Sequence, residues 1–258
     1  MIATFDPHPV RHFRPDTPPF RLTSLGQREE LFAAAGADAM LVFAFDGELA
    51  ATSPDDFIER LLVEHLGIHG VVTGEDFTFG AKAAGTRESL QNSPKIAAMN
   101  VCSVAEHGGT ISSSRIREAL KAGKPDEAAR LLTRPFAVRG TVQHGDKRGR
   151  TIGYPTANLD MGQYLRPAYG IYAVTGRDLG SGESWQGAAN LGVRPQFEPA
   201  KELLEPYFFD FDGDLYGREI EVALHHFIRP EARFDSLEAL QAQMARDCDE
   251  ARRLLAAG

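Results

Sequence analysis

The 258-residue chain has little cysteine and no long hydrophobic run. Its two cysteines, Cys102 and Cys248, have neither C-x-x-C spacing nor the dense usage of a secreted disulfide framework, so a reducing cytoplasm is expected. The longest apolar run, from Met40 to Phe45, is far shorter than the roughly 20 residues of a membrane span. We therefore expect a cytoplasmic protein that is neither exported nor bound to a membrane.

Positive charge is also scarce. The chain has 36 acidic and 28 basic residues, a net charge of −8, and neither half carries a basic excess. This balance argues against a nucleic-acid-binding surface. No H-E-x-x-H motif is present, and Gly67 interrupts the spacing of His65 and His69, so no zinc site is predicted. With 43% hydrophobic residues, the chain has the composition of a folded globular protein of one large or two small domains.

The first half alternates short apolar runs with helix signals. Ser24 and Gln27 form a capping box, and Ser53 precedes Pro54 at another helix start. Further helices are expected over residues 113–122 and 125–132. This alternation predicts βαβ units and a parallel sheet, an α/β domain over residues 1–130.

The second half, residues 131–258, changes to β-rich segments broken by glycine and proline. Alternating residues such as Ile220, Val222 and Leu224 indicate half-buried strands, which predicts an antiparallel barrel or sandwich. Apolar residues from Leu237 to Leu255 recur at spacings of three and four, so the chain closes with an amphipathic helix.

A glycine-rich basic segment opens this second half. It contains Gly145, Gly149, Arg150 and Gly153 and runs into Pro155, Thr156 and Asn158. Glycines allow a backbone to approach phosphate oxygens closely, and the Thr156 hydroxyl and Asn158 amide oxygen could complete the ligand shell of Mg²⁺. An ordinary hairpin with a solvated basic tip is the equally weighted alternative.

Glu205 is an isolated carboxylate within the apolar run from Leu203 to Phe208. A carboxylate among large apolar neighbours must be paired, exposed or functional, so Glu205 is a general-base candidate. An outward-facing glutamate on a strand is the commoner case.

Two other segments invite a ligand. The segment from Asp210 to Asp214 has its glycine at the fourth position where a calcium loop needs the sixth, so a solvated acidic turn is predicted. Ser113, Ser114, Arg115 and Arg117 stand at an expected helix start, where free N–H groups favour a phosphate, although a serine cap on a surface helix explains them too.

Taken together, these motifs resemble the riboflavin kinase module of the bacterial bifunctional riboflavin kinase/FAD synthetase family. The resemblance rests on residues 140–159, Asn190 to Pro195, Leu204–Glu205, Phe209 to Gly217 and Phe227 to Pro230. The upstream half resembles that family's FMN adenylyltransferase module through residues 4–9, 74–80 and 111–117.

The resemblance implies a β-barrel kinase that uses ATP and Mg²⁺ to convert riboflavin to FMN. Glu205 would accept the hydroxyl proton, and Thr156 and Asn158 would help to hold the metal. The resemblance assigns ATP or flavin binding to Gly145, Gly149, Arg150, Gly153, Pro155 and Asn190. It assigns nucleotide binding in the adenylyltransferase to His8, Asp76, Ser113, Ser114, Arg115 and Arg117.

The family's first strand and its G-x-F-D-G-V-H-x-G-H stretch have no counterpart here, and the chain opens on what should be the second strand. We therefore expect an incomplete doubly wound sheet and inefficient FAD synthesis. The alternatives are a fully bifunctional enzyme whose upstream residues are missing from this chain, or a non-catalytic flavin-binding module. The expected partners are the small-molecule substrates ATP and riboflavin or FMN, with no nucleic acid and no membrane.

Overall fold

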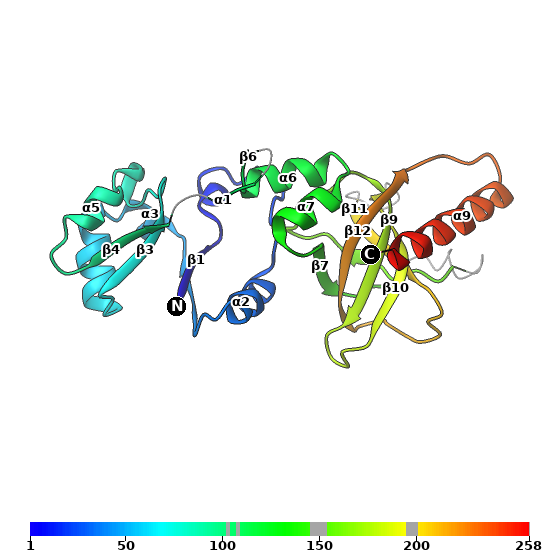
Figure 1. Cartoon of the computed structure of the whole chain (residues 1–258), viewed down its shortest axis with the longest axis horizontal. Coiled ribbons are helices and arrows are strands. Elements are labelled where there is room, and N and C mark those ends of the chain that lie inside the picture. Colours follow the sequence, from blue (N-terminus) through cyan, green and yellow to red (C-terminus); the bar gives the residue numbers. More distant parts are fainter. Residues whose placement is uncertain (102–103, 107–108, 145–153, 195–200, 258) are drawn as a thin grey trace. The chain divides into compact units, whose positions relative to one another are not determined.

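The computed structural model describes residues 1–101, 104–106, 109–144, 154–194 and 201–257. The chain forms two compact units, one of residues 1–18 and 29–111 and one of residues 19–28 and 112–258. Figure 1 shows their elements along the chain. The helices over 113–132 pack within the second unit. The division at residue 130 made from the sequence stays a prediction.

The first unit combines short strands with short helices. In chain order the elements are β1 (Ile2–Asp6), α1 (Pro9–Phe13), α2 (Leu25–Ala34, whose first four residues belong to the second unit), β2 (Met40–Ala44), α3 (Gly47–Ala51), α4 (Pro54–Asp56), the π-helix η1 (Phe57–His65), β3 (Gly70–Gly74), the 3₁₀ helix η2 (Ala81–Ala83), α5 (Arg87–Gln91), β4 (Ala97–Val101), β5 (Ala105–Glu106) and β6 (Gly109–Thr110). Both sequence-predicted caps are confirmed: Gln27 N–H donates to Ser24 Oγ at 3.1 Å, and Asp56 N–H to Ser53 Oγ at 3.1 Å.

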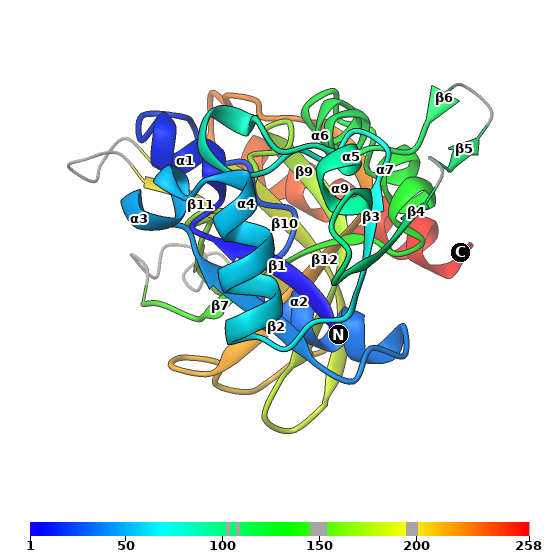
Figure 2. The same ribbon diagram turned by 90° about the vertical axis from the view of Figure 1, so that its left-hand side faces the viewer.

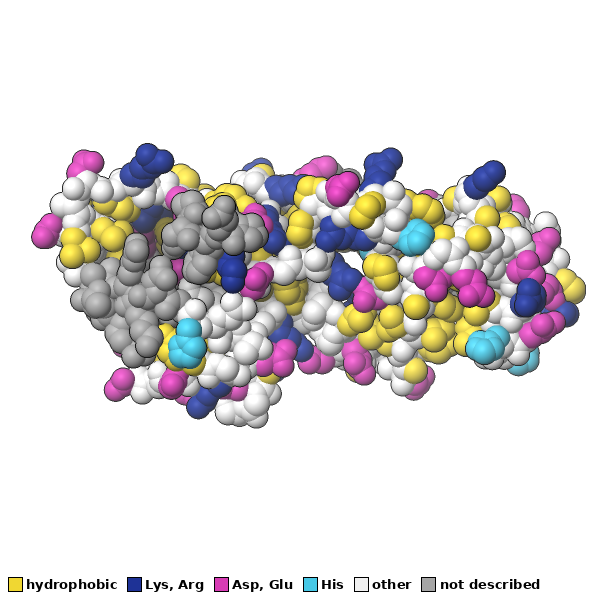
Figure 3. Space-filling view, turned by 180° about the vertical axis from the view of Figure 1, so that it is seen from behind, with side chains coloured by type: hydrophobic (Ala, Val, Ile, Leu, Met, Phe, Trp, Pro, Cys, Tyr) yellow, Lys and Arg dark blue, Asp and Glu magenta, His cyan; other side chains and the backbone are white. Residues whose placement is uncertain are grey.

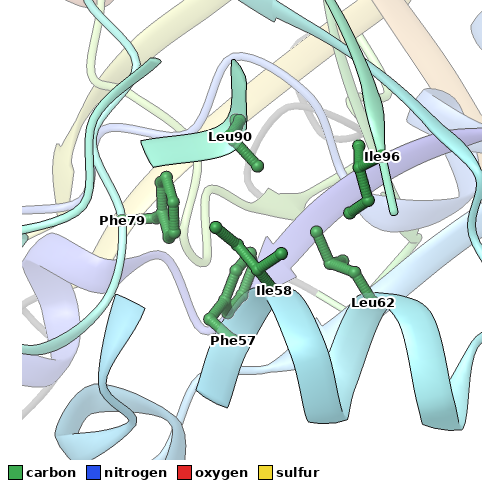
Figure 4. Packing of buried hydrophobic residues seen from close by; sticks show 6 residues of the cluster. All are labelled: Phe57, Ile58, Leu62, Phe79, Leu90 and Ile96. Carbon is green, nitrogen blue, oxygen red and sulfur yellow. The ribbon is translucent and has the colours of Figure 1, made fainter. Parts of the chain in front are cut away.

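Four strands of this unit pair in parallel, as the sequence predicts, in two separate ribbons, and the short strands β5 and β6 pair antiparallel. β1 pairs with β2 and β3 with β4, and among the described strands no pairing joins the two ribbons. Figure 2 shows them as distinct pairs. Phe57, Ile58 and Leu62 of η1 meet the buried side chains of Phe79, Leu90 and Ile96 in one apolar core (Figure 4).

The β3–β4 ribbon buries one face and exposes the other. Val71 and Ala98 pack against the core, whereas the next residues along each strand, Val72 and Met99, are 61% and 66% exposed. Parallel sheets are usually covered on both faces, because their crossover helices pack there. This face is therefore an apolar surface that the described residues leave uncovered.

The second unit is an antiparallel sheet with helices. Its elements are α6 (Ser113–Lys121), α7 (Pro125–Leu132), β7 (Phe136–Thr141), β8 (Leu159–Asp160), β9 (Gly170–Asp178), β10 (Ser184–Arg194), β11 (Lys201–Phe208), β12 (Glu219–Pro230) and α9 (Leu237–Ala256). The six strands lie in the order β7-β12-β9-β10-β11-β8, every pairing is antiparallel, and a bridge between Gln143 and Asn158 nearly joins the two ends. The arrangement is an almost closed barrel rather than a sandwich.

Alternation along the strands divides this barrel into an apolar interior and an outer face. Leu204 and Leu191 are fully buried inside. Ala173 and Ala188, on the outer face, pack with Ala251 of α9. The predicted C-terminal amphipathic helix is thus confirmed, and it covers the outer face of β9 and β10.

Side-chain charges on the face in Figure 3 are mixed, with acidic and basic groups interspersed. This agrees with the absence of a basic excess in the composition. Among the described residues, no helix has the length and apolarity needed to span a bilayer.

Candidate active site

Asn158, Glu205 and Asn190 form a row across three neighbouring strands. Leu159 stands opposite Leu204, and the Ala157 N–H donates to the Pro206 carbonyl at 2.9 Å, so Asn158 is opposite Glu205. On the other side of β11, Glu205 is opposite Asn190. Residues opposite one another share a face of the sheet, with Cβ atoms about 5 Å apart. The three side chains therefore emerge together on the outer face.

Glu205 is a paired carboxylate rather than a free surface group. Its Oε2 contacts the guanidinium of Arg194, and the two side chains are only 18% and 19% exposed. No described residue hydrogen-bonds to Oε1 of Glu205. One carboxylate oxygen is thus held by a cation while the other remains able to accept a proton.

Asn190 also retains unused hydrogen-bonding capacity. Its Nδ2 donates to Glu231 Oε1 at 3.3 Å, whereas its Oδ1 is buried without a partner among the described residues. A buried acceptor left unpaired costs about 1–3 kcal/mol, so such an atom points to a missing donor. A ligand hydroxyl or N–H on this face would supply one.

A cavity of about 300 Å³ adjoins the same segment. Pro155, Thr156 and Ala157 line it from one side, and the turn from Phe211 to Tyr216 from the other. Arg252 of α9 holds this turn by a two-armed contact with Asp210, at 2.9 and 3.2 Å, which lowers the pKa of the Asp210 carboxyl. The predicted acidic turn is therefore present, and it closes a pocket.

Two side-chain oxygens of the segment that borders this cavity suit a hard divalent cation, and of their two residues Thr156 lines the cavity itself. Thr156 brings a hydroxyl and Asn158 an amide oxygen, and within the described part of the chain neither side chain has a hydrogen-bond partner. Asp212 and Asp214 also line this cavity. Mg²⁺ prefers few protein oxygens and keeps phosphate and water as its other ligands. The residues present fit that ion, although no cluster of three or more acidic, histidine or cysteine ligands occurs among the described residues.

Aromatic and apolar groups of β11 and α9 pack against each other. The Tyr154 and Tyr207 rings meet edge to face, with centroids 5.1 Å apart. Burial raises the pKa of the nearby Cys248 thiol to about 11. A thiol with such a pKa stays protonated at neutral pH, so Cys248 acts here as a packing residue and not as a nucleophile.

The glycine-rich segment singled out from the sequence lies mostly outside the described residues. Gly145, Gly149, Arg150 and Gly153 lie outside the described residues. Pro155 is described and lines the cavity. The ligand roles assigned to all of them stay predictions.

The residues expected for the adenylyltransferase fall in both units. In the first, His8 caps α1 by accepting from the Val10 N–H at 3.2 Å, and Asp76 is exposed after β3.

In the second unit, Ser113 and Ser114 are exposed in the first turn of α6, while Arg115 pairs with Glu127 at 3.8 Å. Arg117 donates to the Phe20 carbonyl at 2.9 Å and lies over the Phe20 ring. In this structure Arg117 serves packing, and the phosphate roles of these four residues stay predictions.

Arg194 belongs to the segment from Asn190 to Pro195 that carried the resemblance but was given no role of its own, and Glu231 was not singled out; both contact the row of site residues. Arg194 follows Asn190 by four positions on one strand, a spacing that places both on one face. That alternation was a usable signal for Arg194. The same alternation could not place Glu231 beside Asn190, because Glu231 follows β12 and not β10.

Two family models match this chain. The FAD synthetase family model matches residues 1–115 and the riboflavin kinase family model residues 132–255. The bifunctional riboflavin kinase/FMN adenylyltransferase of Escherichia coli (strain K12) is 41% identical over 251 residues, covering 96% of this chain and 80% of that protein. The protein of the same description from Pseudomonas fluorescens is 39% identical over 259 residues, covering 99% and 82%.

A crystal structure from Streptococcus pneumoniae, described as a macrolide-efflux protein, has a TM-score of 0.84 and 31% identity, covering 97% of this chain and 82% of that one. The resemblance drawn from the motifs is confirmed by the two family models and by the identities to both bacterial relatives. The chain belongs to the bifunctional riboflavin kinase/FMN adenylyltransferase family.

Proposed function

We propose that the second unit is a riboflavin kinase, which transfers the γ-phosphate of ATP to the 5′-hydroxyl of riboflavin and releases FMN and ADP. This proposal is supported by the position of Glu205 opposite Asn158. Asn158 directly follows residues 155–157, which line a nucleotide-sized cavity. Family membership supports the same activity. The scarcity of cysteine fits a reaction in the cytoplasm.

Glu205 is the proposed general base. As the 5′-oxygen of riboflavin attacks the γ-phosphorus, its proton passes to the free carboxylate oxygen of Glu205, and the bond from phosphorus to the ADP oxygen breaks. Phosphoryl transfer depends mainly on positioning and charge neutralisation, so one oriented carboxylate is sufficient to direct the nucleophile. The pairing of Oε2 with Arg194 fixes that orientation.

The segment from Thr156 to Asn158 is the proposed meeting point of the two substrates. Thr156 and Ala157 line the cavity, which we assign to the nucleotide, while Asn158 is opposite Glu205 on the outer face, which we assign to riboflavin. Thr156 and Asn158 would hold Mg²⁺, which neutralises the phosphate charge when bound. The unpaired Oδ1 of Asn190 would accept a hydrogen bond from riboflavin.

The experiment that tests this function incubates the full chain with riboflavin, ATP and Mg²⁺ and follows FMN by chromatography. We expect FMN and ADP in equal amounts. A folded chain that binds riboflavin tightly but forms no FMN would identify a flavin-binding module instead.

We further propose that this chain forms FAD much more slowly than FMN. The parallel ribbons β1–β2 and β3–β4 are not paired with each other among the described strands, and Val72 and Met99 are exposed. A nucleotide site at the carboxyl ends of a parallel sheet depends on continuous pairing to place its loops. The same assay, supplied with FMN, measures FAD, and comparable rates for both products would contradict this proposal.

A further inference from the structure

Glu231 contacts two residues of the site, Arg194 and Asn190, but has no role in the reaction described above. Its Oε1 lies 3.5 Å from one guanidinium nitrogen of Arg194 and accepts the 3.3 Å hydrogen bond from Asn190 Nδ2. Another guanidinium nitrogen of Arg194 contacts Glu205. One cation is therefore shared by two carboxylates, of which only Glu205 is opposite Asn158.

The backbone of β10 is shaped to receive the Glu231 carboxylate. Asn190, Gly192 and Arg194 alternate along β10 and so share one face. A Cβ atom added at Gly192 would stand 2.7 Å from Cδ of Glu231, inside normal contact distance. The missing side chain at Gly192 thus leaves the space in which Glu231 reaches both neighbours.

The chain leading to Glu231 is anchored to helix α9. Two residues earlier, Arg229 makes a two-armed ion pair with Asp247, with Nε to Oδ1 at 2.9 Å and a terminal nitrogen to Oδ2 at 2.6 Å. Asp247 is 4% exposed, so this pair is largely removed from solvent. Bidentate pairs between arginine and carboxylate fix geometry as well as charge. The position of Glu231 is therefore set by the barrel and the helix together.

We propose that Glu231 is a positioning residue for the kinase reaction, an inference that rests on the proposed function. A carboxylate only accepts hydrogen bonds, so Glu231 obliges the Asn190 amide to present its nitrogen and turns Oδ1 away, ready for a riboflavin donor. By holding one nitrogen of Arg194, Glu231 also restricts Arg194 to one oxygen of Glu205. The other oxygen stays available for the alcohol proton.

The first test measures steady-state FMN formation and riboflavin binding, by quenching of riboflavin fluorescence, in the full-length Glu231→Gln variant. Without the Glu231 carboxylate, both terminal nitrogens of Arg194 can bind Glu205, and the Asn190 amide can rotate. We expect kcat to fall about tenfold or more and the riboflavin Kd to rise, with an unchanged KM for ATP, because small misplacements at a reacting centre cost one to two orders of magnitude. Glu231→Asp should restore part of kcat, and Glu250→Gln, at an exposed pair on α9, should match the wild type.

Gly192→Ala provides a second test that removes no charge. Its methyl group displaces the end of a flexible side chain, so folding is retained while the Glu231 carboxylate is pushed away. We expect kcat to fall as in Glu231→Gln, and the double variant to be no slower than Glu231→Gln alone, because both changes remove the same contact. Wild-type kcat and riboflavin affinity in Gly192→Ala and Glu231→Gln would overturn the role of Glu231. A wild-type chain that forms no FMN would instead contradict the proposed function itself.

Discussion

The hydroxyl of Tyr164 donates a 2.7 Å hydrogen bond to Oε1 of Gln27, a residue 137 positions earlier in the chain. Gln27 is 4% exposed, and its Nε2 donates to the Ala137 carbonyl at 3.1 Å and to Glu221 at 2.9 Å. One buried amide thus fastens residues 19–28 to the barrel. The same contact, together with Arg139, holds the pKa of the Glu221 carboxyl below its usual range although burial opposes this.

Gln27→Ala is expected to lower the free energy of unfolding of the second unit by about 1–3 kcal/mol, because Tyr164 and Glu221 lose buried partners. Urea unfolding followed by circular dichroism measures the loss. Tyr164→Phe should destabilise less, and the two changes should not be additive. Equal stability of Gln27→Ala and the wild type would show that this amide does not fasten the segment.

The metal dependence of the kinase follows from the oxygen ligands of Thr156 and Asn158. Chelation with EDTA should abolish FMN formation, and added Mg²⁺ should restore it. Asn158→Ala should raise the Mg²⁺ concentration needed for half-maximal rate by about tenfold, since one protein ligand is lost. Asn92→Ala, at the end of α5, is the matched control. Unchanged activity in EDTA would rule out this use of the two residues.

His225 should make stability depend on pH. Burial lowers the pKa of its imidazole, and Nε2 lies 3.0 Å from the Thr175 hydroxyl. The unfolded chain therefore takes up a proton near pH 6.5 that the folded chain resists, so stability is full above that pH and falls as the pH drops below it.

Thermal unfolding between pH 7.5 and 5.5 measures this dependence. His225→Gln should show a smaller fall in Tm over that interval than the wild type, whereas His69→Gln, at an exposed residue, should follow the wild type. An identical pH dependence in all three proteins would remove His225 as the cause.

The uncovered face of the β3–β4 ribbon should bind hydrophobic probes. Met99→Lys combined with Val72→Thr should reduce the fluorescence of bound anilinonaphthalene sulfonate and change the unfolding free energy by less than about 0.5 kcal/mol, because both side chains are exposed. Leu90→Ala, in the core of the same unit, should cost about 2–5 kcal/mol. A large loss of stability in the surface variant would mean that this face is packed.

The parts of the structure that follow local rules could be predicted from the sequence. Ser24 with Gln27 and Ser53 with Asp56 are spaced i,i+3, which is the distance over which a cap acts. The C-terminal helix was evident for the same reason, since its apolar residues repeat at three and four. The parallel pairing expected for the first unit is present in β1–β2 and β3–β4, but the division of these strands into two ribbons depends on long-range contacts that periodicity does not report.

The geometry of the site could be predicted from the sequence only in part. Glu205 was identified by its polar character among apolar neighbours, but its position opposite Asn158 depends on a register fixed by the burial of Leu204 and Leu159 inside the barrel. The place of Glu231 could not be read at all, because two irregularities in the pairing of β12 with β9, between Leu224 and Arg229, break the alternation that leads to it.

The most direct measurement of the central claim is the turnover of Glu205→Ala with riboflavin, ATP and Mg²⁺. Loss of a positioned base typically costs 10²–10⁴-fold, so we expect kcat for FMN formation to fall by at least about 100-fold. Riboflavin binding should persist, because Asn190 remains. Turnover within a few-fold of the wild type, in a folded variant, would contradict the assignment of Glu205 and the account of the site built upon it.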